Sequence, residues 1–159
     1  MTRFFTRIAA ASLMALVSTA AFAAEPENTL VISLKDGDVT IALRPDLAPK
    51  HVEQIKALTR KGAYDNVVFH RVIDGFMAQT GDVQFGNSAK DFNPAQAGMG
   101  GSDLPDIKAE FSQEPFVRGT VGMARAQSPD SANSQFFITF GDASFLNGQY
   151  TVVGNVESG

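Results

Sequence analysis

Residues 67–82 read VVFHRVIDGFMAQTGD and carry the strongest structural signal in the chain. Branched and aromatic residues dominate 67–73, which predicts a β-strand, and Asp74-Gly75 predicts a turn before a short segment at 76–79. Alternation along the strand puts Arg71 on one face and His70 and Val72 on the other. Arg71 is then either a surface cation stacked on an aromatic ring or a functional group, and the pattern leaves both open.

A second strand with mixed character is predicted at residues 135–140, QFFITF. Alternation assigns the core face to Phe136, Ile138 and Phe140. The opposite face holds Gln135, Phe137 and Thr139. An outer face with a phenylalanine beside a glutamine is typical of a binding surface.

The flanking elements are mostly strands and loops. Residues 29–34 and 39–43 predict a hairpin around a turn at 35–38, and 120–124 and 150–153 predict further strands. A helix is expected over 48–60, with Gly62 as its C-terminal cap and His51 on its solvated side. Residues 80–102 read as a long surface loop. Several strands and few helices, without βαβ alternation, indicate an all-β barrel or sandwich.

The N-terminal 23 residues have the pattern of a secretory signal. Arg3 and Arg7 precede an apolar run at 8–20, and Ala21-Phe22-Ala23 offers a cleavage site. An uncleaved membrane anchor is the alternative, although the run is shorter than the roughly 20 residues of a spanning helix. We therefore expect a periplasmic domain at 24–159 that keeps no membrane contact after signal cleavage.

Composition excludes several classes of function. The full chain of 159 residues has a formal charge of −4, and without Arg3 and Arg7 the charge is about −6 with no basic cluster, so a nucleic-acid partner is not expected. Cysteine is absent, and the two histidines have no metal-ligand spacing, so neither a metal nor another cofactor is expected. No nucleophile elbow or phosphate-binding loop is present. A monomer is the default state.

Several ordered motifs resemble the cyclophilin family of peptidyl-prolyl cis-trans isomerases. Residues 69–82 resemble the family's signature around its catalytic arginine, and 123–126 (MARA), 134–138 (SQFFI) and 145–154 resemble the segments that follow it. The fold implied by this resemblance is mainly β, a closed eight-stranded antiparallel barrel with capping helices. The family continues beyond the position of Gly159 with a helix and a last strand that pairs with the first. The resemblance therefore implies that domain 24–159 lacks these elements and leaves the strand at 29–34 with an open edge.

The resemblance also assigns roles to individual residues. Arg71 takes the catalytic position. The substrate-binding positions fall on Phe76, Met77, Gln79, Gly98, Ala124, Arg125, Ala126, Gln135, Phe137, Phe145, Leu146 and Tyr150. Phe76, Met77, Phe137 and Leu146 form the proline pocket, while the two glutamines and the Arg125 backbone bind the peptide backbone. Tyr150 stands where the family often has histidine, and Phe145 replaces a tryptophan of cyclosporin-sensitive members, so weak cyclosporin binding is expected.

The implied function is rotation about X-Pro bonds in unfolded or exported proteins. No bond breaks in this reaction, which fits the missing nucleophile and cofactor. A non-catalytic module that holds proline-containing segments remains an alternative, since it would use the same pocket. A carrier with an apolar ligand inside the barrel is a third possibility, and the bulky core-face residues argue against it.

Overall fold

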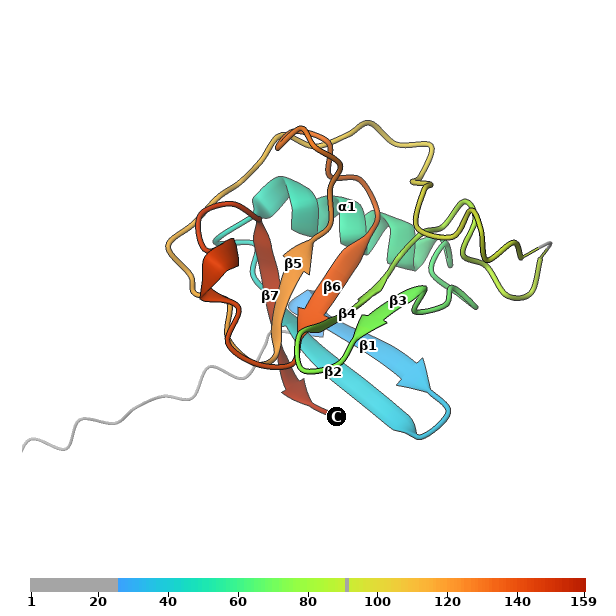
Figure 1. The fold of residues 1–159 in the computed structure, drawn as a ribbon, viewed down its shortest axis with the longest axis horizontal. Helices are drawn as coiled ribbons and strands as arrows, with labels where there is room; N and C mark the ends of the chain where they lie inside the picture. The colour runs from blue at the N-terminus through green and yellow to red at the C-terminus, as the bar shows by residue number, and fades with distance from the viewer. Residues whose placement is uncertain (1–25, 91) are drawn as a thin grey trace, which may run out of the picture.

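The computed structural model describes residues 26–90 and 92–159, and seven strands there form one curled antiparallel sheet (Figure 1). The strands are β1 (Thr29–Leu34), β2 (Gly37–Leu43), β3 (Arg71–Ile73), β4 (Met77–Thr80), β5 (Thr120–Met123), β6 (Phe136–Thr139) and β7 (Val152–Ser158). Their order in the sheet is β1-β2-β7-β5-β6-β4-β3. The helices of the described part are α1 (Pro49–Arg60) and two short 3-10 turns, η1 (Pro26–Asn28) and η2 (Ser144–Leu146).

The hairpin and the long helix follow the predictions closely, and local chemistry explains where they end. The hairpin pairs Leu34 with Gly37, whose φ of 138° suits glycine, so its turn is two residues shorter than predicted. Helix α1 begins at Pro49 and ends in a Schellman motif. There Gly62 has φ 65°, and the N–H of Ala63 donates to the Leu58 carbonyl at 3.0 Å.

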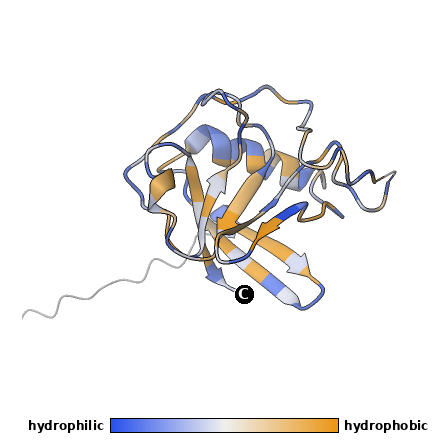
Figure 2. Cartoon of the chain, in the orientation of Figure 1, coloured by the Kyte–Doolittle hydropathy of each residue, from blue (hydrophilic) through white to orange (hydrophobic). Residues whose placement is uncertain are grey.

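Strands β5, β6 and β7 separate two hydrophobic clusters because their successive side chains point to opposite faces. Hydrophobic residues recur along the strands of the sheet (Figure 2). The first cluster lies between the sheet and α1 and contains Leu30, Ile41, Leu43, Ala48, Val52, Ile55, Val121, Met123, Ala132, Phe136 and Val153. The second lies on the other face and contains Met77, Phe116, Phe137, Ala143, Leu146 and Val152. Side chains thus fill the interior of the curled sheet, and the prediction that Val121, Met123 and Phe136 belong to the core is confirmed. Phe140, also expected on the core face, follows the end of β6 and belongs to neither cluster.

The sheet does not close into the expected eight-stranded barrel. Strand β1 has one strand neighbour, β2, and β3 forms the other end of the sheet. A groove of about 540 Å³ lies along the open side of the sheet, between β1 and the segment from Tyr64 to Phe69 that precedes β3. The predicted strand over 67–73 is also shorter, because Val67 forms only an isolated bridge with Asn87 and the N–H of Val68 donates to the Gly86 carbonyl. The 81–102 loop therefore takes the hydrogen bonds that a strand partner would have used.

The expectation that His51 lies on the solvated side of the helix is wrong, since its side chain is fully buried. Its Nδ1 lies 2.6 Å from Oε2 of Glu110. The Glu110 carboxylate also accepts the backbone N–H groups of Lys50 and His51, which have no partner within the helix. A glutamate distant in sequence therefore caps α1, and helical periodicity could not reveal it.

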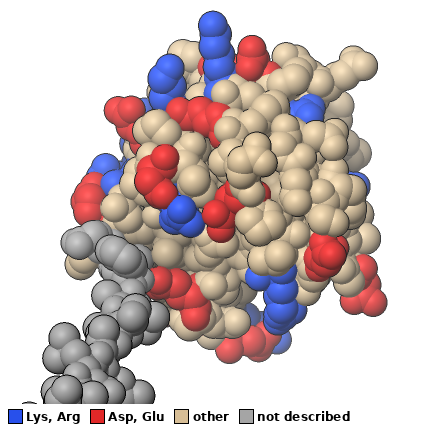
Figure 3. Space-filling view, turned by 90° about the vertical axis from the view of Figure 1, so that its left-hand side faces the viewer, with Lys and Arg blue, Asp and Glu red and all other residues tan. Residues whose placement is uncertain are grey.

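Charges of both signs are interspersed on the face shown in Figure 3, and lysine and arginine do not gather there into a patch. In the part of the chain that the structure describes, no helix is long and apolar enough to cross a membrane.

Candidate functional site

Strand register places the key side chains next to one another on the outer face of the sheet. Arg71 of β3 pairs with Gln79 of β4, Gln79 pairs with Phe137 of β6, and Phe137 pairs with Gly122 of β5. A Cβ atom on Gly122 would lie 2.6 Å from the rings of both Phe116 and Phe137. The glycine therefore makes room for Phe137 to lie flat at the centre of the face.

An apolar pocket of about 360 Å³ lies over Phe137. It is lined by Arg71, Phe76, Met77, Gln79, Ala124, Arg125, Phe137, Phe145, Leu146 and Tyr150. Phe137 is buried and forms the floor, stacked on Phe116 at 5.7 Å and meeting the Tyr150 ring edge to face at 5.8 Å. Phe145 is 62% exposed at the rim, with its ring 5.4 Å from that of Phe76. These rings form a concave apolar surface whose chemistry suits a small apolar ring.

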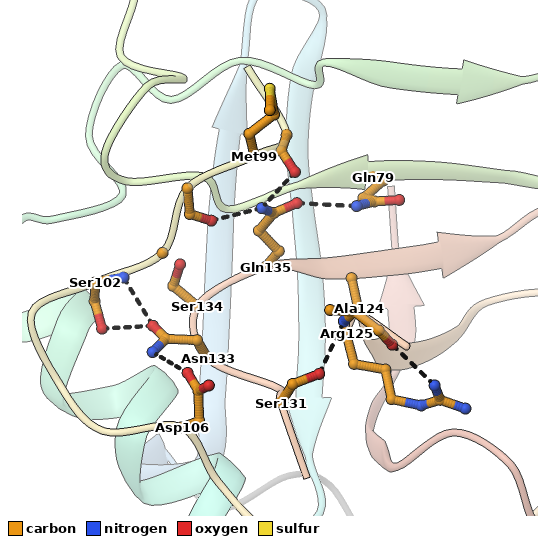
Figure 4. A pocket seen from close by; sticks show the side chains of 14 residues that line it. Gln79, Met99, Ser102, Asp106, Ala124, Arg125, Ser131, Asn133, Ser134 and Gln135 are labelled. Atoms are coloured by element: carbon orange, nitrogen blue, oxygen red, sulfur yellow. Dashed lines mark hydrogen bonds between the residues drawn. The ribbon is translucent and has the colours of Figure 1, made fainter. Parts of the chain in front are cut away.

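A more polar pocket of about 390 Å³ adjoins the first and shares Gln79, Ala124 and Arg125 with it. Figure 4 shows its lining, which comes from the loop around Gly98 and from the segments before β6 and after β5. Its other lining residues are Gly98, Met99, Gly100, Gly101, Ser102, Asp106, Ala126, Ser131, Asn133, Ser134 and Gln135. The two pockets are therefore adjacent parts of one surface, joined at these three residues.

Side-chain amides connect the polar pocket to Arg71. Nε2 of Gln135 donates to the carbonyls of Gly98 at 3.1 Å and Gly100 at 2.7 Å (Figure 4). Its Oε1 accepts a hydrogen bond from Gln79 at 2.9 Å, and Oε1 of Gln79 accepts a long one from Arg71 Nη1 at 3.5 Å. The orientation of the exposed Arg71 guanidinium is thus biased by groups in the neighbouring pocket.

Arg125 forms the wall between the two pockets. Its guanidinium lies 4.5 Å from the centre of the Tyr150 ring, a cation–π contact. It also donates to the carbonyls of Ala126, Gln127 and Gln149. These bonds hold the side chain against its own loop and against the segment that precedes β7.

Burial is the main cause of the lowered pKa of His70, whose ring packs beneath Gly98. The ring is therefore neutral at pH 7 and adds no charge beside Arg71. Among the described residues, no group of three or more His, Asp or Glu side chains could hold a metal ion. The chemistry available at the site is a hydrogen bond from a permanent cation beside an apolar pocket.

Every site residue named from the sequence lines at least one of the two pockets. Their individual roles toward a substrate stay predictions. Sequence reasoning missed Asp106, Ser131 and Asn133 in the polar pocket and Phe116 beneath Phe137. These residues come from irregular segments, where no hydrophobic period marks a face.

Comparison with known proteins agrees with this geometry. Residues 29–159 match the family model "Cyclophilin type peptidyl-prolyl cis-trans isomerase/CLD". A "Probable peptidyl-prolyl cis-trans isomerase" of Brucella suis is 68% identical over 156 residues, which are 96% of this chain and 79% of the relative. An Arabidopsis thaliana peptidyl-prolyl cis-trans isomerase, CYP23, is 39% identical over 92% of this chain and 65% of its own length.

Solved structures show the same likeness. A Cryptosporidium parvum cyclophilin type peptidyl-prolyl cis-trans isomerase, crystallised in the presence of the dipeptide Ala-Pro, aligns with a TM-score of 0.70 and 31% identity over 82% of this chain and 79% of its own. The cyclophilin AquaCyp293 of Hirschia baltica aligns with a TM-score of 0.70 and 26% identity, covering 84% of this chain and 65% of its own. The ordered motifs, the arginine beside an apolar pocket and these likenesses agree, and the chain belongs to the cyclophilin-type peptidyl-prolyl cis-trans isomerase family.

Proposed function

We propose that the two pockets bind proline-containing segments of exported proteins and that Arg71 catalyses their cis-trans isomerisation. The observation that carries the proposal is the position of Arg71, which lines the same apolar pocket as Phe76, Phe137 and Leu146. A prolyl ring in this pocket brings its nitrogen within reach of the guanidinium. The Ala-Pro dipeptide present with the Cryptosporidium relative supports a ligand of this chemistry.

The physical basis is the electronic change that accompanies rotation. A planar X-Pro amide has partial double-bond character, and its rotation barrier is about 18–20 kcal/mol. In the twisted transition state amide resonance is lost, and the prolyl nitrogen recovers a lone pair that can accept a hydrogen bond. The Arg71 guanidinium therefore interacts more strongly with the transition state than with the planar ground state, which is the requirement for catalysis.

The surrounding residues make this hydrogen bond stronger and better placed. The rings of Phe76, Phe137 and Tyr150 exclude water from one side of the reacting amide, which lowers the local dielectric. Gln79, Gln135 and the Arg125 backbone would hold the peptide backbone while the bond turns. Each 1.4 kcal/mol or so of such differential binding increases the rate tenfold.

Ligand binding is tested with two tetrapeptides that differ only in proline or alanine at one position. In 15N-labelled protein, the proline peptide should shift the amide signals of Phe137, Leu146 and Tyr150, and the alanine peptide should shift them far less. Equal shifts with both peptides would contradict the proline pocket. Binding without faster isomerisation would instead favour the non-catalytic holding module.

Export rests on the sequence of residues 1–23, which lie outside the described residues. Expression of the full chain in a Gram-negative host should give a periplasmic protein whose N-terminal sequence begins at Ala24. Recovery from the cytoplasm with residues 1–23 still attached would refute the periplasmic location without affecting the proposed chemistry. The same sample, analysed by sedimentation, should behave as a monomer.

A further inference from the structure

A fully buried carboxylate lies behind the wall of the polar pocket. Asp82 follows β4 and is 0% exposed, and no ion pair of Asp82 is found among the described residues. Its Oδ1 accepts the backbone N–H groups of Gln84 at 3.1 Å and Phe85 at 2.9 Å. Its Oδ2 accepts those of Gly98 at 2.7 Å and Gly100 at 3.0 Å. Backbone N–H groups alone thus compensate the burial of this charge.

Two of these donors belong to the turn that forms the wall of the polar pocket. Gly98 and Gly100 donate their N–H groups to Asp82 and accept Nε2 of Gln135 with their carbonyls. The Asp82 carboxylate therefore holds the turn from its buried side, and the Gln135 amide holds it from the side of the polar pocket. The described residues between β4 and β5 include neither a helix nor a strand, so no regular backbone hydrogen bonding there could replace these contacts.

The turn is also shaped to pack closely against its support. Gly98 has φ 97°, and a Cβ there would lie 2.9 Å from the His70 ring. A Cβ on Gly100 would lie 2.6 Å from Oδ1 of Asp82. Both glycines allow the backbone to approach groups that a side chain would displace.

We propose that Asp82 is a positioning residue for the isomerase reaction. The carboxylate fixes the Gly98–Gly100 turn, the turn fixes the Gln135 amide, and Gln135 orients Gln79 beside Arg71. Asp82 does not line either pocket, so it acts only through these groups. This inference rests on the proposed function of the site and adds the origin of its rigidity.

The test replaces one carboxylate oxygen by an amide nitrogen in Asp82→Asn. The amide NH₂ would face the N–H groups of Gly98 and Gly100 or of Gln84 and Phe85, so one pair loses its acceptor. We expect kcat/KM for a proline tetrapeptide to fall at least about tenfold, because small misplacements of binding groups have effects of this size. The side-chain NH₂ signals of Gln79 and Gln135 should shift in the 15N spectrum.

Glu110→Gln is the matched control, because Glu110 also accepts backbone N–H groups but does so at the start of α1, outside both pockets. It should lower thermal stability while leaving kcat/KM and the two glutamine signals nearly unchanged. Equal losses of kcat/KM in the two variants, or wild-type values in Asp82→Asn, would overturn the proposal.

Two further measurements keep the proposal falsifiable if Asp82→Asn does not fold. In the wild-type protein, hydrogen exchange of the Gly98 and Gly100 amides should be strongly slowed although both lie in a loop, and rapid exchange would overturn the proposal. A wild-type protein with protected glycine amides but no isomerase activity would instead refute the proposed function. It would leave intact the conclusion that Asp82 fixes the Gly98–Gly100 turn.

Discussion

Phe137 shows how a single residue depends on a glycine of the neighbouring strand, because Gly122 of β5 pairs with it. Its ring forms the pocket floor only because Gly122 leaves space for it and for Phe116. Arg71, Gln79 and Phe137 then occupy neighbouring strands in register. The site is thus built from the regular geometry of the sheet, while its rim comes from loops.

Gly122→Ala should damage the pocket from below. The new methyl group would lie 2.6 Å from two aromatic rings, so one ring must move. Overpacking of this kind typically lowers the free energy of unfolding by about 1–3 kcal/mol. We also expect a higher KM for proline peptides, because the Phe137 ring would be pushed into the pocket. Urea unfolding and isomerase kinetics check both effects, and an unchanged KM would contradict the role of Gly122.

Phe145→Trp should strengthen cyclosporin binding. Phe145 is exposed at the pocket rim and cannot donate a hydrogen bond, whereas an indole N–H can. Calorimetry should find weak binding to the wild type and tighter binding to the variant. Tight binding by the wild type would contradict the expected importance of the missing donor.

Among the elements, the sequence predicts best those whose signals are local. The β1–β2 hairpin and α1 follow from alternation, helical period and glycine turns. The conformation of the segment before β3 does not follow from such local signals. Whether Val67 and Val68 form a strand or only a bridge depends on which other segment of the chain lies beside them. The burial of His51 likewise depends on Glu110, which reaches α1 from a distant loop.

The exposed edge of β1 has a consequence for solubility. Val31 and Leu34 are 49% and 45% exposed on a strand with a single strand neighbour, and such edges favour association between molecules. Val31→Lys should reduce aggregation at high protein concentration without changing kcat/KM, since β1 lies outside both pockets. Light scattering during incubation checks this, with Lys35→Ala in the adjacent turn as a control. Faster aggregation of Val31→Lys would contradict the edge interpretation.

For the whole molecule, the residues named from the family motifs gather around two adjoining pockets, whereas the expected closed barrel does not form. Arg71, Met77, Gln79 and Phe137 meet at the apolar pocket because β3, β4 and β6 are neighbours in the sheet, whereas the remaining site residues come from loops and short turns around these strands. The open edge of β1, which the resemblance implies, is confirmed by the strand order, in which β1 forms one end of a sheet that does not close. The burial of the Asp82 carboxylate could not be predicted from the sequence, because its four backbone donors depend on the conformation of the loop.

Acid should destabilise the protein in two stages. Burial lowers the pKa of His70 below its usual 6.5, so the unfolded state binds a proton first and stability falls as pH drops below about that value. Burial raises the pKa of Glu110, but hydrogen bonds from His51 and Lys50 outweigh it and lower the pKa below 4.5. Its contribution is complete above pH 4.5 and is lost as pH falls through the lowered pKa.

Urea unfolding at a series of pH values checks this behaviour. His70→Gln should remove the upper stage. Glu110→Gln should reduce the lower stage without abolishing it, because Arg44 also lowers the pKa of Asp46. A free energy of unfolding that increases as the pH falls from 7 to 5 would contradict the prediction.

The most direct measurement is NMR exchange spectroscopy on a proline tetrapeptide with the wild-type protein, Arg71→Ala and Arg118→Ala. Arg118 is an exposed arginine outside both pockets and serves as the matched control. We predict fast cis-trans exchange with the wild type and Arg118→Ala, and a rate close to the uncatalysed one with folded Arg71→Ala. Near-wild-type exchange in Arg71→Ala would contradict the assignment of Arg71 as the catalytic residue.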